Sequence, residues 1–326
     1  MNKIKTIFRL LISISLIFGL SSCTSVQIKQ VQDKHFSNLD HQRFSKILSE
    51  TEKILTVSDK KLDKEKIKTR LEGNALTMRE GQYDLAAKKY QDGKIDTINF
   101  KATVETATKE KNWPRYAMYV SEALGDKSPY LVLLNQANPR DNYKINNWVR
   151  LFPDAKIPAT NTLNKGIELC SSKNSSLVMK PSDVVSKYIS GLNGNKQDAE
   201  KFKDDIFNKQ LLDEKNKLID SLRDISDLKI DYKNGNENIA LKLNDGSALV
   251  FTSFKYDMQF LRGAHKKDGK IAGAIGAILG DNNKIDSDIT ATYAVSVAFI
   301  VPSEKAKDNK IIPVGAQRVL VSVIKK

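Results

Sequence analysis

The sequence predicts an α+β protein with two domains, each formed by N-terminal helices packed on a curved antiparallel sheet. In each half of the chain, apolar residues recur first at helical spacing and then at every second position. Asn-Gly and Asp-Gly pairs, which favour hairpin turns, separate alternating runs in the second half. Serine and proline gather between the halves, as is typical of a linker. We therefore expect a first domain at 39–158, a linker at 159–180 and a second domain at 181–326.

The composition is that of a globular protein. Of the 326 residues, 40% are hydrophobic and 28% are charged, which excludes a disordered chain, a collagen and a polytopic membrane protein. The formal net charge is +14, and the surplus is spread along both halves. Such a diffuse surplus suits a protein held near anionic lipid or an anionic wall polymer, and nucleic acid is not expected as a partner.

The N-terminus has the pattern of a lipoprotein signal peptide at 1–22. Lysines and Arg9 precede an apolar run from Leu10 to Leu20, which is too short to span a bilayer. The run ends in Leu20-Ser21-Ser22-Cys23, which resembles the bacterial lipobox. This resemblance implies acylation of Cys23, by diacylglycerol and chains such as palmitate, and anchoring at the extracytoplasmic face of the cell membrane. Polar residues at 23–38 are expected to form a tether.

Helices are expected first in the first domain. The carboxylate of Asp40 is placed to cap a helix, and a second helical stretch begins near Asp63, with expected breaks at Gly73 and Gly81. The apolar period then changes from helical to two, which predicts antiparallel strands. The expected strands are 98–104, 116–120, 130–135 and 143–152.

The second domain repeats this order. Helices are expected from Asp183 to Gly191 and from Asp198 to Arg223. Alternating strands follow, with hairpin turns expected at Asn234-Gly235 and at Asp245-Gly246. The strands 289–301 and 311–324 are expected to complete the sheet.

The order of helices and strands resembles the nuclear-transport-factor-2-like and cystatin-like folds, in which helices pack into a bent sheet and leave a pocket. Four segments also resemble a family of actinobacterial lipoproteins described only as a domain of unknown function. These segments are 113–116, 131–136, 139–144 and 148–153. The chain departs from the family's pattern at one place: where the family has Lys-Leu-Trp, this chain has Lys144-Ile145-Asn146. The resemblance implies a location and a layout of the chain, without an activity.

Five residues in these segments form a candidate ligand-binding site: Arg115, Arg140, Tyr143, Trp148 and Arg150. Guanidinium groups suit carboxylate or phosphate, and aromatic rings supply an apolar wall. A regular strand would place Tyr143 and Trp148 on opposite faces, so such a site requires one bulge between them. In the alternative, Arg140 caps a turn and Trp148 fills the core.

A glycine-rich loop is expected at 263–283. Its lysines, Lys266, Lys267 and Lys270, and the apolar Ile275 and Ile278 are candidate membrane contacts. The alternative is a long connection that closes over its own domain.

No catalytic, cofactor or metal site is expected from the sequence. The three histidines lack metal-ligand spacing, and no phosphate-binding or nucleophile motif occurs. The unpaired thiol of Cys170 is interpreted as half-buried, and Asp213-Glu214 as part of a solvated helix face.

The favoured function is a lipid-anchored binding or envelope-support lipoprotein. Its expected partner is membrane lipid, bound through Cys23, and the sequence identifies no protein partner. The alternative is a cone-fold enzyme of the isomerase or hydrolase type that uses a carboxylate or tyrosine in a pocket.

Overall fold

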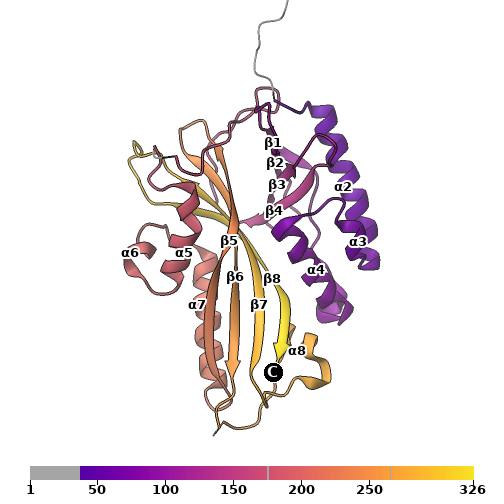
Figure 1. The fold of residues 1–326 in the computed structure, drawn as a ribbon, viewed down its shortest axis with the longest axis vertical. Helices are drawn as coiled ribbons and strands as arrows, with labels where there is room; N and C mark the ends of the chain where they lie inside the picture. The colour runs from indigo at the N-terminus through magenta and orange to yellow at the C-terminus, as the bar shows by residue number, and fades with distance from the viewer. Residues whose placement is uncertain (1–36, 175, 265) are drawn as a thin grey trace, which may run out of the picture. The chain divides into compact units, whose positions relative to one another are not determined.

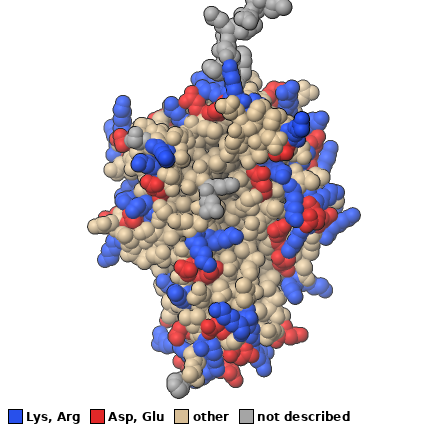
Figure 2. Space-filling model, in the orientation of Figure 1, with Lys and Arg blue, Asp and Glu red and all other residues tan. Residues whose placement is uncertain are grey.

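The computed structural model describes residues 37–174, 176–264 and 266–326. The predicted signal peptide, Cys23 and most of the predicted tether lie outside these described residues. The described residues belong to one compact unit. Basic and acidic side chains are interspersed over the face drawn in Figure 2, so positive charge does not gather in a single patch there.

Eight strands form one antiparallel sheet in the order β1-β2-β3-β4-β8-β7-β6-β5 (Figure 1). The first-half strands are β1 (Ala102–Ala107), β2 (Arg115–Ser121), β3 (Tyr130–Gln136) and β4 (Lys144–Leu151). The second-half strands are β5 (Asp227–Lys242), β6 (Ala248–Leu261), β7 (Ile289–Val301) and β8 (Ile312–Lys325). The predicted α+β class is therefore confirmed, but both sets of strands belong to one sheet.

The two sets of strands meet at a narrow seam between β4 and β8. Two residue pairs form it, Arg150 with Ala316 and Leu151 with Gly315. Each set is otherwise a meander of neighbouring antiparallel strands, as the alternating sequence predicts. Beyond the seam β4 and β8 diverge, and the space between them is filled from the first half of the chain.

The first-half helices are α2 (His41–Lys61), α3 (Lys64–Ile67) and α4 (Gly73–Ala87), followed by the short η1 (Tyr90–Gly93). The predicted helix after Asp40 is confirmed, because an Asp40 carboxylate oxygen accepts a hydrogen bond from the Arg43 amide at 2.7 Å. The break expected at Gly81 is wrong, since α4 continues through this residue. Helix α4 lies between β4 and β8, and a Cβ atom at Gly81 would be 2.6 Å from the main-chain oxygen of Leu320.

The second-half helices are η2 (Pro181–Asp183), α5 (Val184–Leu192), α6 (Lys196–Ala199), α7 (Ile206–Leu222), α8 (Gly273–Leu279) and η3 (Gly280–Asn282). The single helix expected from Asp198 to Arg223 is wrong, because the chain leaves α6 and restarts at α7. The carboxylate of Asp205 begins α7 by accepting a hydrogen bond from the Asn208 amide at 2.7 Å. Helix α8 lies between β6 and β7 in sequence, so the helices do not all precede the sheet.

The hairpin turn expected at Asn234-Gly235 is also wrong. Strand β5 passes through Gly235 with a bulge between Asn234 and Asn238. A Cβ atom at Gly235 would lie 2.0 Å from the main-chain oxygen of Ser253, so glycine is needed there for close approach of two strands. The turn at Asp245-Gly246 is confirmed, because it joins β5 to β6.

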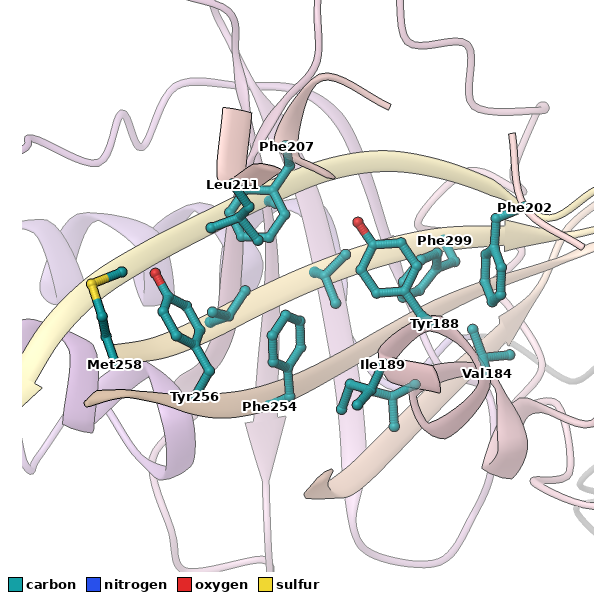
Figure 3. Packing of buried hydrophobic residues seen from close by; sticks show 14 of the residues in the cluster. Val184, Tyr188, Ile189, Phe202, Phe207, Leu211, Phe254, Tyr256, Met258 and Phe299 are labelled. Carbon is teal, nitrogen blue, oxygen red and sulfur yellow. The ribbon is translucent and has the colours of Figure 1, made fainter. Parts of the chain in front are cut away.

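Three clusters of buried apolar residues make up the core. One lies among α2, α4 and the β2–β4 strands, and another lies between α5, α7 and the β6–β8 strands. Figure 3 shows part of the latter, where Tyr188 of α5 packs edge-on against Phe299 of β7 at 5.1 Å between ring centroids. The third cluster includes Leu131 and Leu249.

The stretch 159–180 packs against the body of the protein. Its residues Leu163, Ile167 and Leu177 are each buried, in three different core clusters. Backbone bridges join Ile167 to Thr108 and Leu177 to Ser303. This stretch thus connects the two halves while covering both, and the proposed division at 159–180 stays a prediction.

Candidate functional site: a cleft beside strand β8

A cleft of about 1590 Å³ lies beside β8, and we call it the β8 cleft. Its floor is formed by the end of β6, the start of β7 and the middle of β8. One wall is α7, and the opposite wall is the end of α4 with η1 and residues 94–97. The glycine-rich segment 270–275 also lines the cleft. Because consecutive residues of a strand point to opposite faces, the lining by Gln317–Leu320 shows that the cleft follows the edge of β8 as well as one face.

Apolar side chains line the part of the cleft between α7 and the glycine-rich segment. Leu218 and Leu222 come from α7, and Met258 and Phe260 come from β6. Ile275 adds a buried side chain from α8. These residues belong to the core cluster under α7 or pack against it, so this part of the cleft is a rigid apolar surface.

Arg318 is the polar centre of the cleft. One of its terminal nitrogens lies 2.5 Å from a carboxylate oxygen of Glu214 on α7, and the other donates a hydrogen bond to the Tyr256 hydroxyl at 2.9 Å. The ring of Tyr293 stacks on Tyr256 with centroids 4.9 Å apart. The Arg318 side chain remains 32% exposed, so the guanidinium is reachable from the cleft.

The tyrosines beside Arg318 stay protonated near neutral pH. Burial raises the pKa of Tyr293 to about 12, although the charge of Arg318 opposes this. Burial also raises the pKa of Tyr256 well above its ordinary value. Arg318 is always charged, so the centre of the cleft presents a fixed cation beside two neutral phenols, with Glu214 as its acidic partner.

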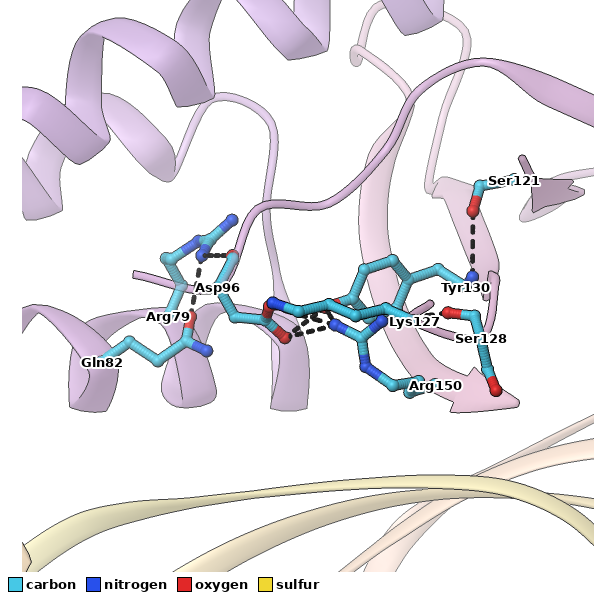
Figure 4. A network of polar contacts seen from close by, with 8 residues as sticks. All are labelled: Arg79, Gln82, Asp96, Ser121, Lys127, Ser128, Tyr130 and Arg150. Carbon is cyan, nitrogen blue, oxygen red and sulfur yellow. Dashed lines mark hydrogen bonds and ion pairs between the residues drawn. The ribbon is translucent and has the colours of Figure 1, made fainter. Parts of the chain in front are cut away.

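Asp96 is a polar residue that lines the cleft, and Figure 4 shows its contacts. Its two carboxylate oxygens accept hydrogen bonds from one Arg150 nitrogen at 3.0 and 2.8 Å, and the Tyr130 hydroxyl donates to the same carboxylate. Its main-chain oxygen accepts a hydrogen bond from Arg79 at 2.8 Å. The Lys127 ammonium lies 4.0 Å from the carboxylate. Arg150 therefore holds a residue that lines the cleft.

The structure brings Tyr143 and Trp148 together inside the core. The required bulge is present, because Leu133 pairs with Asn147 while Leu134 pairs with Ile145. Both aromatic side chains lie in the core cluster under α4, with Trp148 only 1% exposed. Neither residue lines the β8 cleft.

The predicted arginines lie in three separate places. Arg115 stacks on the ring of Trp113 at 3.9 Å, and its charge partly opposes the burial that raises the pKa of Tyr143 to about 12. Arg140 is exposed in a turn, where its amide donates to the Asn138 side chain. Arg150 contacts the cleft through Asp96. The five residues do not converge on one surface.

The predicted membrane contacts are also divided. Lys266 pairs with Asp227 at 2.8 Å and Lys267 pairs with Asp224 at 3.0 Å. Lys270 is exposed and lines the β8 cleft. Ile275 is buried, and Ile278 packs against the core, so both apolar side chains contact the protein itself.

A carboxyl group whose pKa is raised by burial occurs at Asp205, but this group caps α7 and accepts a hydrogen bond from the Tyr188 hydroxyl at 3.0 Å. It does not line the β8 cleft.

Cys170 is half-buried, as expected. Within 37–174, 176–264 and 266–326, no set of three or more histidine, cysteine or acidic residues is placed to bind a metal. Over the same ranges, no helix has the length and apolarity needed to cross a bilayer.

Sequence reasoning missed Arg318 and misjudged Glu214. Arg318 alternates with Ala316 and Leu320 along β8, which places a guanidinium on an apolar strand face. An arginine at an apolar position of a predicted strand is the feature of the sequence that could have identified this site. Glu214 was assigned to a solvated helix face, but its side chain is 34% exposed and turns toward Arg318.

No family model, no curated protein and no solved structure matches this chain.

Proposed function

We propose that this protein is a lipid-anchored, extracytoplasmic binding protein that holds a small ligand in the β8 cleft. The observation that carries the proposal is the combination of an apolar wall with the reachable guanidinium of Arg318. Ligand sites are typically concave and mostly apolar, with a few polar groups that fix the ligand's orientation. The β8 cleft has this character, and its volume of about 1590 Å³ is ample for a small molecule.

Binding fits the groups in the cleft better than catalysis does. The guanidinium of Arg318 cannot exchange a proton, and burial keeps Tyr256 and Tyr293 protonated. A cone-fold enzyme needs a group that gains and loses a proton near its working pH. The centre of the cleft is therefore suited to holding a charged group.

The binding role can be tested with residues 24–326, which include the whole compact unit, and the neutral fluorescent probe N-phenyl-1-naphthylamine. We expect saturable binding that is weakened about tenfold or more by Leu218→Lys, which places a charge in the apolar wall. Leu212→Lys is the matched control, because Leu212 is 55% exposed on the same helix. Absence of saturable binding, or equal binding by both variants, would contradict the proposal.

The anchor rests on Leu20-Ser21-Ser22-Cys23 and has a separate test. We expect labelled fatty acid to be incorporated into the wild-type chain and not into Cys23→Ser, which should be secreted or remain uncleaved. A Cys23→Ser chain that is cleaved normally and stays in the membrane would contradict the anchor. Attraction to anionic lipid or wall polymer remains part of the proposal and rests on the net positive charge, which is +14 for the full sequence and 14 − 3 = +11 without the three basic residues of 1–22.

We also propose that the chain consists of two nuclear-transport-factor-2-like halves, 39–158 and 181–326. Support comes from the order of elements, since each half begins with helices and supplies four antiparallel strands, although α8 interrupts the strands of the second half. The resemblance to actinobacterial lipoproteins is consistent with the same layout and adds no activity.

A further inference from the structure

We propose that the ligand of the β8 cleft is an amphiphile with an apolar chain and an anionic head group, and that the head group replaces Glu214 on Arg318. This inference rests on the proposed binding role and specifies its ligand class. Carboxylate and phosphate head groups share the required chemistry, since both present oxygen pairs to a guanidinium.

Glu214 already occupies the position that the head group would take. Its carboxylate contacts one terminal nitrogen of Arg318 at 2.5 Å, while Tyr256 accepts from the other. The Glu214 side chain is 34% exposed, so it can rotate toward solvent without movement of the α7 backbone. Arg318, in contrast, is fixed by Tyr256 and by the ring of Tyr293, 5.6 Å away. A free anion can therefore exchange with Glu214 at a guanidinium that stays in place.

The apolar wall begins next to this position. Leu218 follows Glu214 by one helical turn on α7, so the two side chains lie on the same side of the helix. Leu222 extends the apolar stripe by a further turn, and Met258 faces it from β6 across the cleft. A ligand whose head contacts Arg318 thus has an apolar surface for its chain.

The charges at the rim favour an anion. Lys270 lines the cleft and forms no ion pair with any residue that the structure describes. The neighbouring Lys266 and Lys267 are each paired with an aspartate. Lys270 therefore leaves the rim with an unneutralised positive charge, which attracts anionic ligands and repels cationic ones.

An added peptide strand is excluded at the edge of β8 that the cleft follows. The backbone of α4 covers that edge so closely that a Cβ atom at Gly81 would be 2.6 Å from the Leu320 oxygen. A strand that pairs with β8 needs a spacing of about 4.8 Å from it. Helix α4 already occupies that space, so the cleft suits a ligand that uses side-chain contacts.

The test measures displacement of N-phenyl-1-naphthylamine by three ligands of equal chain length, below their micelle concentrations: laurate, monododecyl phosphate and the neutral dodecanol. We expect at least one anion to compete about tenfold better than dodecanol. Arg318→Gln should remove this preference while the probe still binds. Glu214→Gln should strengthen binding of the anion, because it frees the guanidinium.

Asp213→Asn is the matched control, because Asp213 pairs with Lys217 on the exposed side of α7 and does not line the cleft. It removes the same charge as Glu214→Gln and should leave competition unchanged. If the probe binds but dodecanol competes as well as both anions, or if Glu214→Gln weakens the anions, the ligand class is wrong and the binding role stands. If the probe itself fails to bind the wild-type chain, the binding role fails as well. If Arg318→Gln does not fold, Arg318→Lys replaces it in the competition measurement. Arg318→Lys should keep a preference for anions that is smaller than that of the wild type.

Discussion

Gly81 of α4 and Leu320 of β8 are in backbone contact, with no space for a side chain between them. A Cβ atom at Gly81 would lie 2.6 Å from the Leu320 oxygen and 3.0 Å from a Val321 methyl group. Helix α4 depends on this contact to fill the space between β4 and β8, and it forms one wall of the β8 cleft. A residue that weakens an isolated helix is therefore required for the packing of this one.

Gly81→Ala should lower the free energy of unfolding by about 1–3 kcal/mol, as overpacked sites do. Gly263→Ala is the control, because its new Cβ atom would have its nearest neighbour at 3.4 Å. Urea denaturation of both variants measures the difference. A Gly81→Ala protein as stable as Gly263→Ala would show that α4 moves away from β8 without cost.

Trp148→Ala should lower the free energy of unfolding by about 3–5 kcal/mol, because Trp148 is 1% exposed in the core. Trp113→Ala should have a much smaller effect, since Trp113 is 37% exposed. Chemical denaturation of the two variants compares the tryptophans of two segments, 113–116 and 148–153, that resemble the lipoprotein family. Similar small losses for both would favour a surface role for Trp148 over its role in the core.

The contact between His41 and Glu105 should make stability depend on pH. The His41 ring donates a hydrogen bond to the Glu105 carboxylate at 2.5 Å, and this bond together with the charge of Glu105 raises the pKa of His41 above 6.5. The stabilisation is fully present below the unfolded value of 6.5 and is lost as pH rises through the higher folded pKa. The melting temperature of the wild type should be higher than that of Glu105→Gln at pH 5.5. At pH 9 the two melting temperatures should be equal. A difference in melting temperature that does not change with pH would contradict this.

Limited trypsin digestion should cut first within 304–310, where every residue is exposed between β7 and β8. Lys305 and Lys307 offer cleavage sites there. The stretch 159–180 should resist longer, because Leu163 and Ile167 are buried. Mass spectrometry of the first fragments shows whether trypsin cuts first within 304–310 or within 159–180. First cleavage within 159–180 would indicate that this stretch is an exposed linker between domains.

Elements with a local signal were predictable from the sequence. The cap at Asp40 and the turn at Asp245-Gly246 act through nearby backbone groups, and both occur as expected. Gly81 and Gly235 were misread as a break and a turn. Each is instead needed because a distant strand approaches its backbone, and no pattern of neighbouring residues encodes that contact.

The cleft was less accessible to prediction than the fold. The bulge at Asn146 is a matter of pairing register, and its place was inferred only from the positions of Tyr143 and Trp148. Arg318 of β8 and Glu214 of α7 meet although they are about a hundred residues apart in sequence. The space between β4 of the first half and β8 of the second half, which α4 of the first half fills, arises only when the two halves combine.

The seam between β4 and β8 also has a kinetic consequence. Arg150 and Ala316 pair across about half of the chain, whereas every other strand pair joins neighbours along the sequence. Closing so long a loop has a large entropic cost, and contacts of this kind form slowly. We therefore expect the two meanders to form early and independently, and their docking through two residue pairs to limit the rate of folding. Until docking occurs, the outer edges of β4 and β8 are unpaired, and aggregation of newly made chains should begin at those edges.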